Sequence, residues 1–299
     1  MDLTTTDFDL AEVQNFAGPL RHDTYPEIST RDVNMTGKSI LVTGASSGCG
    51  KAIVRSFARC GASRIILLAR RDMSSLVEEV EAVAQSSGWR KPQVLALRVD
   101  HTVQSQVEEA ARKVELEFGR SLDILVNNAG CMEAWLPVTE SHPESWWRTW
   151  EVNVKGPYLV SRSFIPFLLR STTKTMVQVT SVGALVTRPG GSAYQGTKLA
   201  VLRLSNHLRL EYADRGLLIH NLHPGAVMTD LALTMPSRLH EMLVDTPELC
   251  GDTVVWLTRE RRVWLQDRFI SAQWNMTSLD AQKDRIVSEN LLRLKLITS

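Results

Sequence analysis

Short apolar runs alternate with helical patterns from residue 39 to residue 222 of this chain, with no linker between them. The apolar runs are 39–42, 64–69, 93–99, 122–126, 176–180 and 217–222, and the helical patterns are 51–60, 74–87, 103–118, 145–170 and 193–215. Buried strands that alternate with helices are typical of a parallel sheet covered on both faces. The pattern predicts an α/β fold: a single doubly wound Rossmann-like domain with a mostly parallel sheet and helices on both faces.

The ends of the chain lack this alternation. Residues 1–36 are polar and without periodicity, and we expect an N-terminal extension that lies on a surface or is partly mobile. The Rossmann domain is expected over 37–275, with a substrate lid at about 228–246, and a C-terminal helical tail over 276–299. A length of 299 residues would also allow two domains, but no break in composition divides the alternating series.

Composition excludes several classes of function. Lys plus Arg is 34 and Asp plus Glu is 33, so the formal charge is +1 and no basic field favours nucleic acid or an anionic membrane. No run approaches 18 apolar residues, and the start MDLTTTDFDLAEVQ lacks the basic and apolar regions of a secretory signal. The four cysteines lie far apart, without a CxxC pair, so no metal site is predicted. We expect a soluble cytoplasmic protein.

Three glycines follow the first apolar run and open the first helical pattern: Gly44, Gly48 and Gly50. Glycine allows a positive φ and a close approach of the backbone to a ligand. The helix that follows offers free N–H groups to a pyrophosphate. The alternative is a turn that only connects strand to helix. The spacing, Thr-Gly-x-x-x-Gly-x-Gly from Thr43, differs from both the G-x-G-x-x-G and the Walker A patterns.

Further motifs stand at independent places along the chain. Asn127-Asn128-Ala129-Gly130 follows the fourth run, Tyr194 and Lys198 are separated by four residues, and Pro224-Gly225 follows the sixth run. Together with the glycine loop, they make residues 37–232 resemble the classical short-chain dehydrogenase/reductase family. The stretches His22–Pro26 and Phe269–Trp274 resemble a fungal branch of that family, many of whose members act in natural-product pathways.

The resemblance implies a catalytic tetrad of Asn153, Ser181, Tyr194 and Lys198. In that family the tyrosine exchanges a proton with the substrate oxygen, the serine polarises this oxygen, and the asparagine kinks its helix and holds a water molecule. An unperturbed tyrosine has a pKa of about 10. We expect Lys198 and a positively charged nicotinamide to lower the pKa of Tyr194. Tyr194 and Lys198 leave the same face of one helix, although such a pair also arises by chance.

The resemblance also implies a set of cofactor-binding residues: Gly44, Ser46, Ser47, Gly48, Cys49, Gly50, Arg70, Arg71, Asp100, Asn128, Ala129, Gly130, Tyr194, Lys198, Pro224, Gly225, Val227 and Thr229. Asp100 would bind the adenine, unless it only caps a helix. Arg70 stands where an acid would accept the ribose 2′-hydroxyl of NAD(H), and its guanidinium suits a 2′-phosphate, with help from Arg71. We therefore expect NADP(H) rather than NAD(H), unless both arginines are merely solvated.

The expected activity is that of a ketoreductase or alcohol dehydrogenase that acts on an apolar small-molecule ketone or alcohol. The segment 228–244 is rich in methionine and leucine, which predicts an adaptable apolar pocket or simple helix packing. Two other readings stay open: an alcohol oxidant or epimerase of the same fold, and a non-catalytic NADP-binding regulator or scaffold. The resemblance implies a homodimer or homotetramer, and no nucleic acid or membrane partner is expected.

Overall fold

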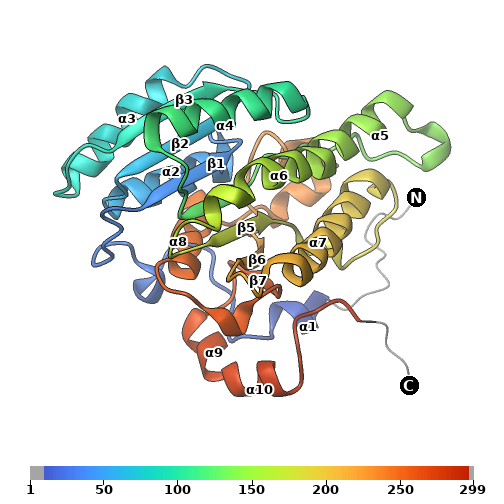
Figure 1. Ribbon diagram of the computed structural model, residues 1–299. Helices are drawn as coiled ribbons and strands as arrows, with labels where there is room; N and C mark the ends of the chain where they lie inside the picture. Colours follow the sequence, from blue (N-terminus) through green and yellow to red (C-terminus); the bar gives the residue numbers. More distant parts are fainter. Residues whose placement is uncertain (1–9, 296–299) are drawn as a thin grey trace.

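The computed structural model describes residues 10–295, and its centre is a seven-stranded parallel sheet in the order β3-β2-β1-β4-β5-β6-β7 (Figure 1). The strands are β1 (Ser39–Thr43), β2 (Arg64–Ala69), β3 (Gln93–Arg98), β4 (Ile124–Asn127), β5 (Thr175–Val179), β6 (Leu218–His223) and β7 (Phe269–Ser271). All six strand pairings are parallel. The predicted doubly wound α/β fold is confirmed.

Helices fill the connections between the strands. They are α1 (Leu10–Gln14), α2 (Gly48–Arg59), α3 (Ser74–Ser86), α4 (Gln104–Phe118), α5 (Pro143–Trp150), α6 (Gly156–Leu168), α7 (Ser192–Tyr212), α8 (Pro247–Thr258), α9 (Met276–Ala281) and α10 (Lys283–Ser288). The single helix expected over 145–170 is interrupted between α5 and α6 by a π-helical turn, η3 (Glu151–Lys155). Apolar periodicity predicted the helix but carries no signal for the wider turn inside it.

The core lies in two layers, one on each face of the sheet. Helices α2, α3 and α8 bury side chains such as Phe57, Val80 and Val254 against one face. Helices α4 and α6 bury side chains such as Val107 and Phe164 against the other face, where Figure 1 shows them in front of the sheet. Because β1, β2, β4 and β5 are covered on both sides, nearly all their residues are buried, whereas the edge strand β3 is partly exposed.

The two ends of the chain pack against each other, and this contact anchors the described part of the N-terminal extension, residues 10–36, on the domain. Tyr25 and Ile28 are buried in the core layer that also contains Trp274 and Met276 of the C-terminal region. The Tyr25 hydroxyl donates to the carbonyl oxygen of Trp274 (3.0 Å) and accepts from the backbone N–H of Met276 (2.9 Å). These apolar residues show no periodicity because they anchor an irregular segment. The expectation for residues 1–9, including a missing secretory signal, lies outside the described residues.

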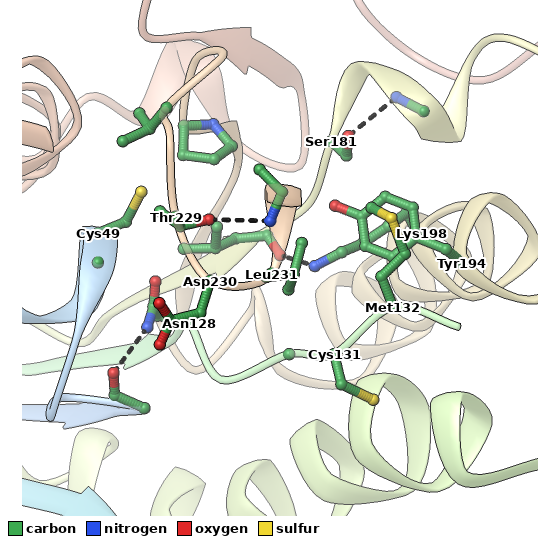
Figure 2. A pocket seen from close by; sticks show the side chains of 18 of the residues that line it. Cys49, Asn128, Cys131, Met132, Ser181, Tyr194, Lys198, Thr229, Asp230 and Leu231 are labelled. Carbon is green, nitrogen blue, oxygen red and sulfur yellow. Dashed lines mark hydrogen bonds between the residues drawn. The ribbon is translucent and has the colours of Figure 1, made fainter. Parts of the chain in front are cut away.

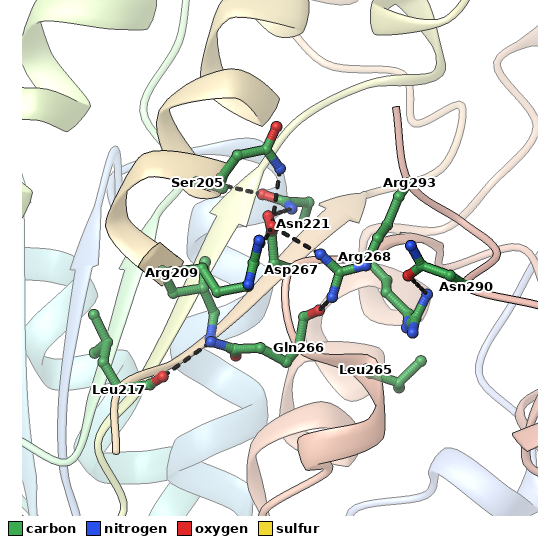
Figure 3. A network of polar contacts seen from close by, with 12 residues as sticks. Ser205, Arg209, Leu217, Asn221, Leu265, Gln266, Asp267, Arg268, Asn290 and Arg293 are labelled. Carbon is green, nitrogen blue, oxygen red and sulfur yellow. Dashed lines mark hydrogen bonds and ion pairs between the residues drawn. The ribbon is translucent and has the colours of Figure 1, made fainter. Parts of the chain in front are cut away.

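A buried carboxylate fixes the C-terminal tail. Asp267, fully removed from solvent at its side chain, accepts from Arg209 of α7 (3.0 Å) and from Arg293 of the tail (3.3 Å), as Figure 3 shows. The Arg293 guanidinium also donates to the carbonyl oxygen of Gln266 (2.8 Å). The tail is therefore part of the folded unit, and it is held beside the edge strand β7.

The strand order reverses at β1, which lies between β2 and β4. Ligands of open α/β sheets bind outside the carboxyl ends of the strands at such a reversal. The fold therefore predicts a ligand-binding crevice between the turns that follow β1 and β4. None of the helices within residues 10–295 is both long and apolar enough to cross a membrane.

Candidate active site

A cavity of about 650 Å³ lies at the carboxyl ends of the central strands. It is lined by every predicted cofactor-binding residue and by three of the four predicted catalytic residues. The lining residues in question are Gly44, Ser46, Ser47, Gly48, Cys49, Gly50, Arg70, Arg71, Asp100, Asn128, Ala129, Gly130, Ser181, Tyr194, Lys198, Pro224, Gly225, Val227 and Thr229. Asn153 does not line the cavity and is buried behind it.

The glycine loop fits a phosphate group through its backbone. Gly44 and Gly48 have positive φ values of 66° and 52°, and a Cβ atom on Gly50 would collide with the carbonyl oxygen of Gly44. Ser47 precedes α2 without a side-chain capping bond, and the first turn of α2 holds no acidic residue. The N–H groups of this turn are therefore open to an anion, as a bound pyrophosphate requires.

Hydrogen bonds join the turn after β4 to the end of β1. The Thr43 hydroxyl oxygen accepts from the backbone N–H groups of Asn128 (3.0 Å) and Ala129 (3.1 Å), and the Asn128 side-chain amide donates to the carbonyl oxygen of Thr43 (2.9 Å; Figure 2). Asn128 thus lines the cavity while its amide nitrogen braces the crevice. Asn127 is buried and donates to the Ser161 hydroxyl (3.1 Å), which joins the end of β4 to α6.

Three predicted catalytic side chains meet on the other side of this crevice (Figure 2). Ser181 follows β5, and its hydroxyl oxygen accepts from the backbone N–H of Gly183 (3.0 Å). Tyr194 and Lys198 lie one turn apart on α7, and the Lys198 Nζ is 5.6 Å from the centre of the Tyr194 ring. Lys198 also donates to the carbonyl oxygen of Val179 (2.9 Å). This bond fixes the ammonium group at the end of β5.

Asn153 lies in the π-helical turn η3 and connects three elements. Its side-chain oxygen accepts from the backbone N–H of Cys131 (2.9 Å), and its Nδ2 donates to the carbonyl oxygen of Cys131 (2.9 Å) and to the Thr197 hydroxyl (3.0 Å). Thr197 precedes Lys198 on α7. The amide of Asn153 therefore holds the turn after Gly130 against the helix that carries Tyr194 and Lys198.

Burial dominates the ionisation of the tyrosine–lysine pair. The hydroxyl of Tyr194 is removed from water, which raises the pKa of Tyr194 to about 12, although the neighbouring Ser181 hydroxyl opposes this rise. Burial also lowers the pKa of Lys198 to about 8. The side chains of this protein alone therefore do not lower the pKa of Tyr194. The expectation names Lys198 together with a positively charged nicotinamide. Desolvation of the phenolate is the largest cause of the raised pKa of Tyr194.

The far end of the cavity contains Asp100, after β3. Its carboxylate accepts from the Thr102 hydroxyl (2.7 Å) and forms an ion pair with Arg148 of α5 (2.9 Å). These partners lower the pKa of Asp100 to about 2 against the opposing effect of partial burial. Both carboxylate oxygens of the residue expected to bind adenine thus have protein partners. Arg148 also lines the cavity, and it could not be predicted from the sequence because it belongs to no motif.

The segment after β6 is tied down by a second carboxylate that the sequence did not reveal. Asp245 is buried and accepts from His22 Nδ1 (2.6 Å), from Gln273 Nε2 (2.8 Å) and from the backbone N–H of Ala226. A Cβ atom on Gly225 would lie 2.6 Å from this carboxylate. The expected lid contains two short 3₁₀ helices, Ala232–Thr234 and Ser237–Met242, and lines the cavity with Leu231, Met235, Leu239 and Met242.

Glu133 is a further buried carboxylate next to the tetrad. It is 5% exposed and accepts from the backbone N–H groups of Ala193 and Tyr194, each at 3.0 Å. It therefore neutralises two open donors at the start of α7 and favours the dipole of that helix. It follows the Asn-Asn-Ala-Gly motif by only three positions, but its partner helix begins sixty residues later.

Known proteins match the chain in both sequence and structure. The family model described as "short chain dehydrogenase" matches residues 38–239. "Short chain dehydrogenase mpl6" of Monascus purpureus is 47% identical over 276 residues, which cover 92% of this chain and 94% of that protein. "Short chain dehydrogenase pigC" of Monascus ruber is 43% identical over 282 residues, covering 93% and 92% of the two chains.

Two solved structures have the same architecture. The 3-ketoacyl-(acyl-carrier-protein) reductase from Brucella melitensis, complexed with NADH, superposes with a TM-score of 0.69 at 26% identity, over 80% of this chain and 97% of that one. A short chain dehydrogenase from Shigella flexneri, complexed with NADP, gives a TM-score of 0.71 at 25% identity, over 82% and 100% of the two chains. One of these proteins holds NADH and the other NADP.

Proposed function

Because this chain belongs to the short-chain dehydrogenase family, we propose that it is an NADP(H)-dependent ketoreductase or alcohol dehydrogenase for an apolar substrate. The observation that best supports this proposal is one cavity lined jointly by the glycine loop and by Ser181, Tyr194 and Lys198. A phosphate-binding backbone and a proton donor are the two parts that hydride exchange demands of a protein. The relatives mpl6 and pigC come from fungi, which agrees with the resemblance to a fungal branch of the family, and on this ground we propose a substrate from natural-product metabolism.

Tyr194, Ser181 and Lys198 have different roles at the substrate oxygen. A bound nicotinamide supplies or accepts the hydride. Tyr194 is protonated at neutral pH, since its pKa is about 12, and it can donate a proton to the oxygen of a carbonyl group as negative charge develops there. The Ser181 hydroxyl can donate a second hydrogen bond to the same oxygen. The pKa of Lys198 is about 8, so Lys198 is positively charged below this pH. Its charge favours the phenolate that Tyr194 becomes when it gives up its proton.

The tyrosine assignment is tested by Tyr194→Phe. We expect turnover of NADPH with a panel of aromatic and polyketide-like ketones to fall by roughly a thousandfold or more, because a positioned acid contributes about 10²–10⁴-fold. Cofactor binding, followed by fluorescence titration, should change little. Tyr212→Phe, in the last turn of the same helix α7 and outside the cavity, is the matched control. A Tyr194→Phe enzyme that keeps most of its turnover would refute the assignment, and NADPH binding without turnover by the wild type would favour the regulator.

The preference for NADP(H) is supported by the residues after β2. Arg70 lines the cavity, and within residues 10–295 its guanidinium has no hydrogen-bond or ion-pair partner. Asp72, the nearest acid, accepts from both the N–H and the hydroxyl of Ser74 at the start of α3, which lowers the pKa of Asp72. We expect Arg70→Gln to reduce kcat/KM for NADPH by at least tenfold while kcat/KM for NADH stays nearly constant. A wild-type preference for NADH would contradict the proposal.

We also propose that the protein acts in the cytoplasm as a homodimer or homotetramer. Helices α5, α6 and α7 support this proposal because they leave Trp147, Tyr158 and Leu199 exposed. Large apolar side chains at the surface favour association when they gather on one face. Light scattering coupled to size exclusion measures the assembly directly, and a monomer at micromolar concentration would contradict it.

A further inference from the structure

The proposed function assigns no role to one arginine of the cavity. Arg188 lies between the catalytic Ser181 and Tyr194 in the sequence and lines the same cavity. Its Nε is buried without a hydrogen-bond partner. Across the described residues 10–295, neither an acidic side chain nor a carbonyl oxygen pairs with the guanidinium. A buried donor without an acceptor costs free energy. The Nε atoms of Arg21 and Arg293 also lack a partner, but of these three arginines only Arg188 lines the cavity and can meet a ligand.

The backbone around Arg188 is fixed. The backbone N–H of Arg188 donates to the side-chain oxygen of Gln195 on α7 (2.9 Å), and Gln195 itself is buried. Two positions later, Gly190 has a φ of +87°, and its backbone packs so closely on Trp135 that a Cβ atom would lie 3.0 Å from the Trp135 carbonyl carbon. Arg188 therefore projects from a loop that is anchored to the helix of Tyr194 and to the cavity wall.

Each of the other arginines of the cavity, like Lys198 and His22, has a partner or a cofactor role. Arg71 faces Asp230 (3.4 Å), and Arg148 pairs with Asp100. His22 pairs with Asp245, and Lys198 donates to the carbonyl oxygen of Val179. Arg70, the other arginine of the cavity whose guanidinium has no partner among residues 10–295, follows β2 and is assigned above to the cofactor phosphate. Arg188 alone is left to act on the substrate.

We propose that Arg188 binds a carboxylate of the substrate, so that the enzyme takes apolar carbonyl compounds that carry an acidic group. This inference rests on the proposed function and deepens it. A guanidinium pairs with a carboxylate through two parallel hydrogen bonds, and this pairing is strongest where water is excluded. Trp135 and the lid side chains Met235 and Leu239 line the same cavity and would cover the apolar part of such a molecule.

The test compares 4-benzoylbenzoate with its methyl ester, which has the same ketone and no charge. Binding to the protein loaded with NADP⁺ is measured by calorimetry for wild type, Arg188→Met and Arg188→Lys. Wild type should bind the acid at least tenfold more tightly than the ester, because a charge-assisted hydrogen bond contributes roughly that much. Arg188→Met should lose this difference while its ester affinity stays within about twofold. Arg188→Lys should keep part of it, because the charge remains.

Two results would overturn the inference: wild type that binds the acid no more tightly than the ester, or Arg188→Met that weakens both ligands equally. Thermal unfolding of each variant shows whether the fold is intact. Consumption of NADPH with both ketones separates this inference from the proposed function. If wild type turns over neither ketone yet binds the acid selectively, the assigned reaction is wrong and the carboxylate site stands. If wild type reduces both ketones, and Arg188→Met leaves the ratio of kcat/KM for the acid to kcat/KM for the ester unchanged, the Arg188 site is wrong and the reaction stands.

Discussion

At the scale of single residues, the Glu133 carboxylate next to Tyr194 has two separable effects. It accepts two backbone N–H groups of α7, and its charge is one of the influences that raise the pKa of Tyr194. Glu133→Gln keeps an acceptor and removes the charge. We expect the pKa that limits alcohol oxidation to fall, so that kcat at low pH rises, since the phenolate then forms more easily.

Glu133→Ala serves as the comparison. It leaves the N–H groups of Ala193 and Tyr194 without an acceptor, which should cost about 1–3 kcal/mol of unfolding free energy. It should also reduce kcat at least tenfold, because the start of α7 loses its anchor. The pH profiles of kcat and urea unfolding measure both effects. A pH profile of Glu133→Gln identical to that of the wild type would show that the charge of Glu133 does not reach Tyr194.

The sequence predicted those site residues that stand at fixed spacings near strand ends. Every predicted cofactor residue lines one cavity because the carboxyl ends of parallel strands meet at one edge. Glu133 was expected to border the site because it follows the Asn-Asn-Ala-Gly motif, but its bond to α7 was not. Arg148, Arg188 and Asp245 were missed as members of the site, since each owes its position to a partner far along the chain. The ionisation of Tyr194 was also missed, because burial depends on the packing of the whole cavity.

At the scale of elements, the close packing of α2 on α8 depends on Gly251. A Cβ atom there would lie 2.7 Å from the carbonyl oxygen of Ala52 and 2.5 Å from the Ser56 hydroxyl. Gly251→Ala should therefore push α8 away from the helix that carries the glycine loop, and reduce the free energy of unfolding by about 1–3 kcal/mol. Urea unfolding measures this change, and weaker NADPH binding should accompany it.

Gly196→Ala on α7 is the matched control for this substitution. A Cβ atom there would meet only Trp150, at an ordinary 3.4 Å. Alanine has the higher helix propensity, so this variant should be neutral or slightly more stable. If Gly251→Ala were as stable as Gly196→Ala, the contact between α2 and α8 would not limit the position of the glycine loop.

Most elements could be predicted from the sequence because apolar spacing determines which residues form buried strands and one-sided helices. The apolar runs 64–69 and 93–99 correspond to β2 and β3 with almost no change of bounds. The π-helical turn at 151–155 could not be predicted from this spacing. It depends on Asn153, whose amide is held by Cys131 and Thr197 from two other elements.

At the scale of the whole molecule, the ends of the chain belong to one folded unit with the sheet. The backbone N–H of Arg21 donates to the carbonyl oxygen of Gln273 (2.7 Å), and the N–H of Asn275 donates to that of Ala17 (3.0 Å). His22 joins the same unit through Asp245 beside the cavity. The sequence could not predict this, because long-range pairing of two irregular segments produces no periodic signal. Because the ends, the sheet and the cavity form one unit, we expect acid that destabilises the core to unfold all three together.

Three buried histidines make this unit sensitive to acid. Burial lowers the pKa of His101, His220 and His223 to about 4 each, whereas an unfolded histidine has a pKa of about 6.5. Between these values the unfolded chain binds more protons, so the folded state is fully favoured above pH 6.5 and loses stability as the pH falls toward 4.

The expected loss is about 3 kcal/mol per histidine by pH 4, as an order of magnitude. Urea unfolding at pH 7.0, 5.5 and 4.5 should therefore show a steep fall in unfolding free energy. His220→Gln, which can still donate to the carbonyl oxygen of Leu265, should reduce the slope by about one proton. His207→Gln, at an exposed position of α7, is the matched control. Equal slopes for wild type and His220→Gln would mean that His220 takes up its proton as readily in the folded protein as in the unfolded chain, and that the acid sensitivity has another source.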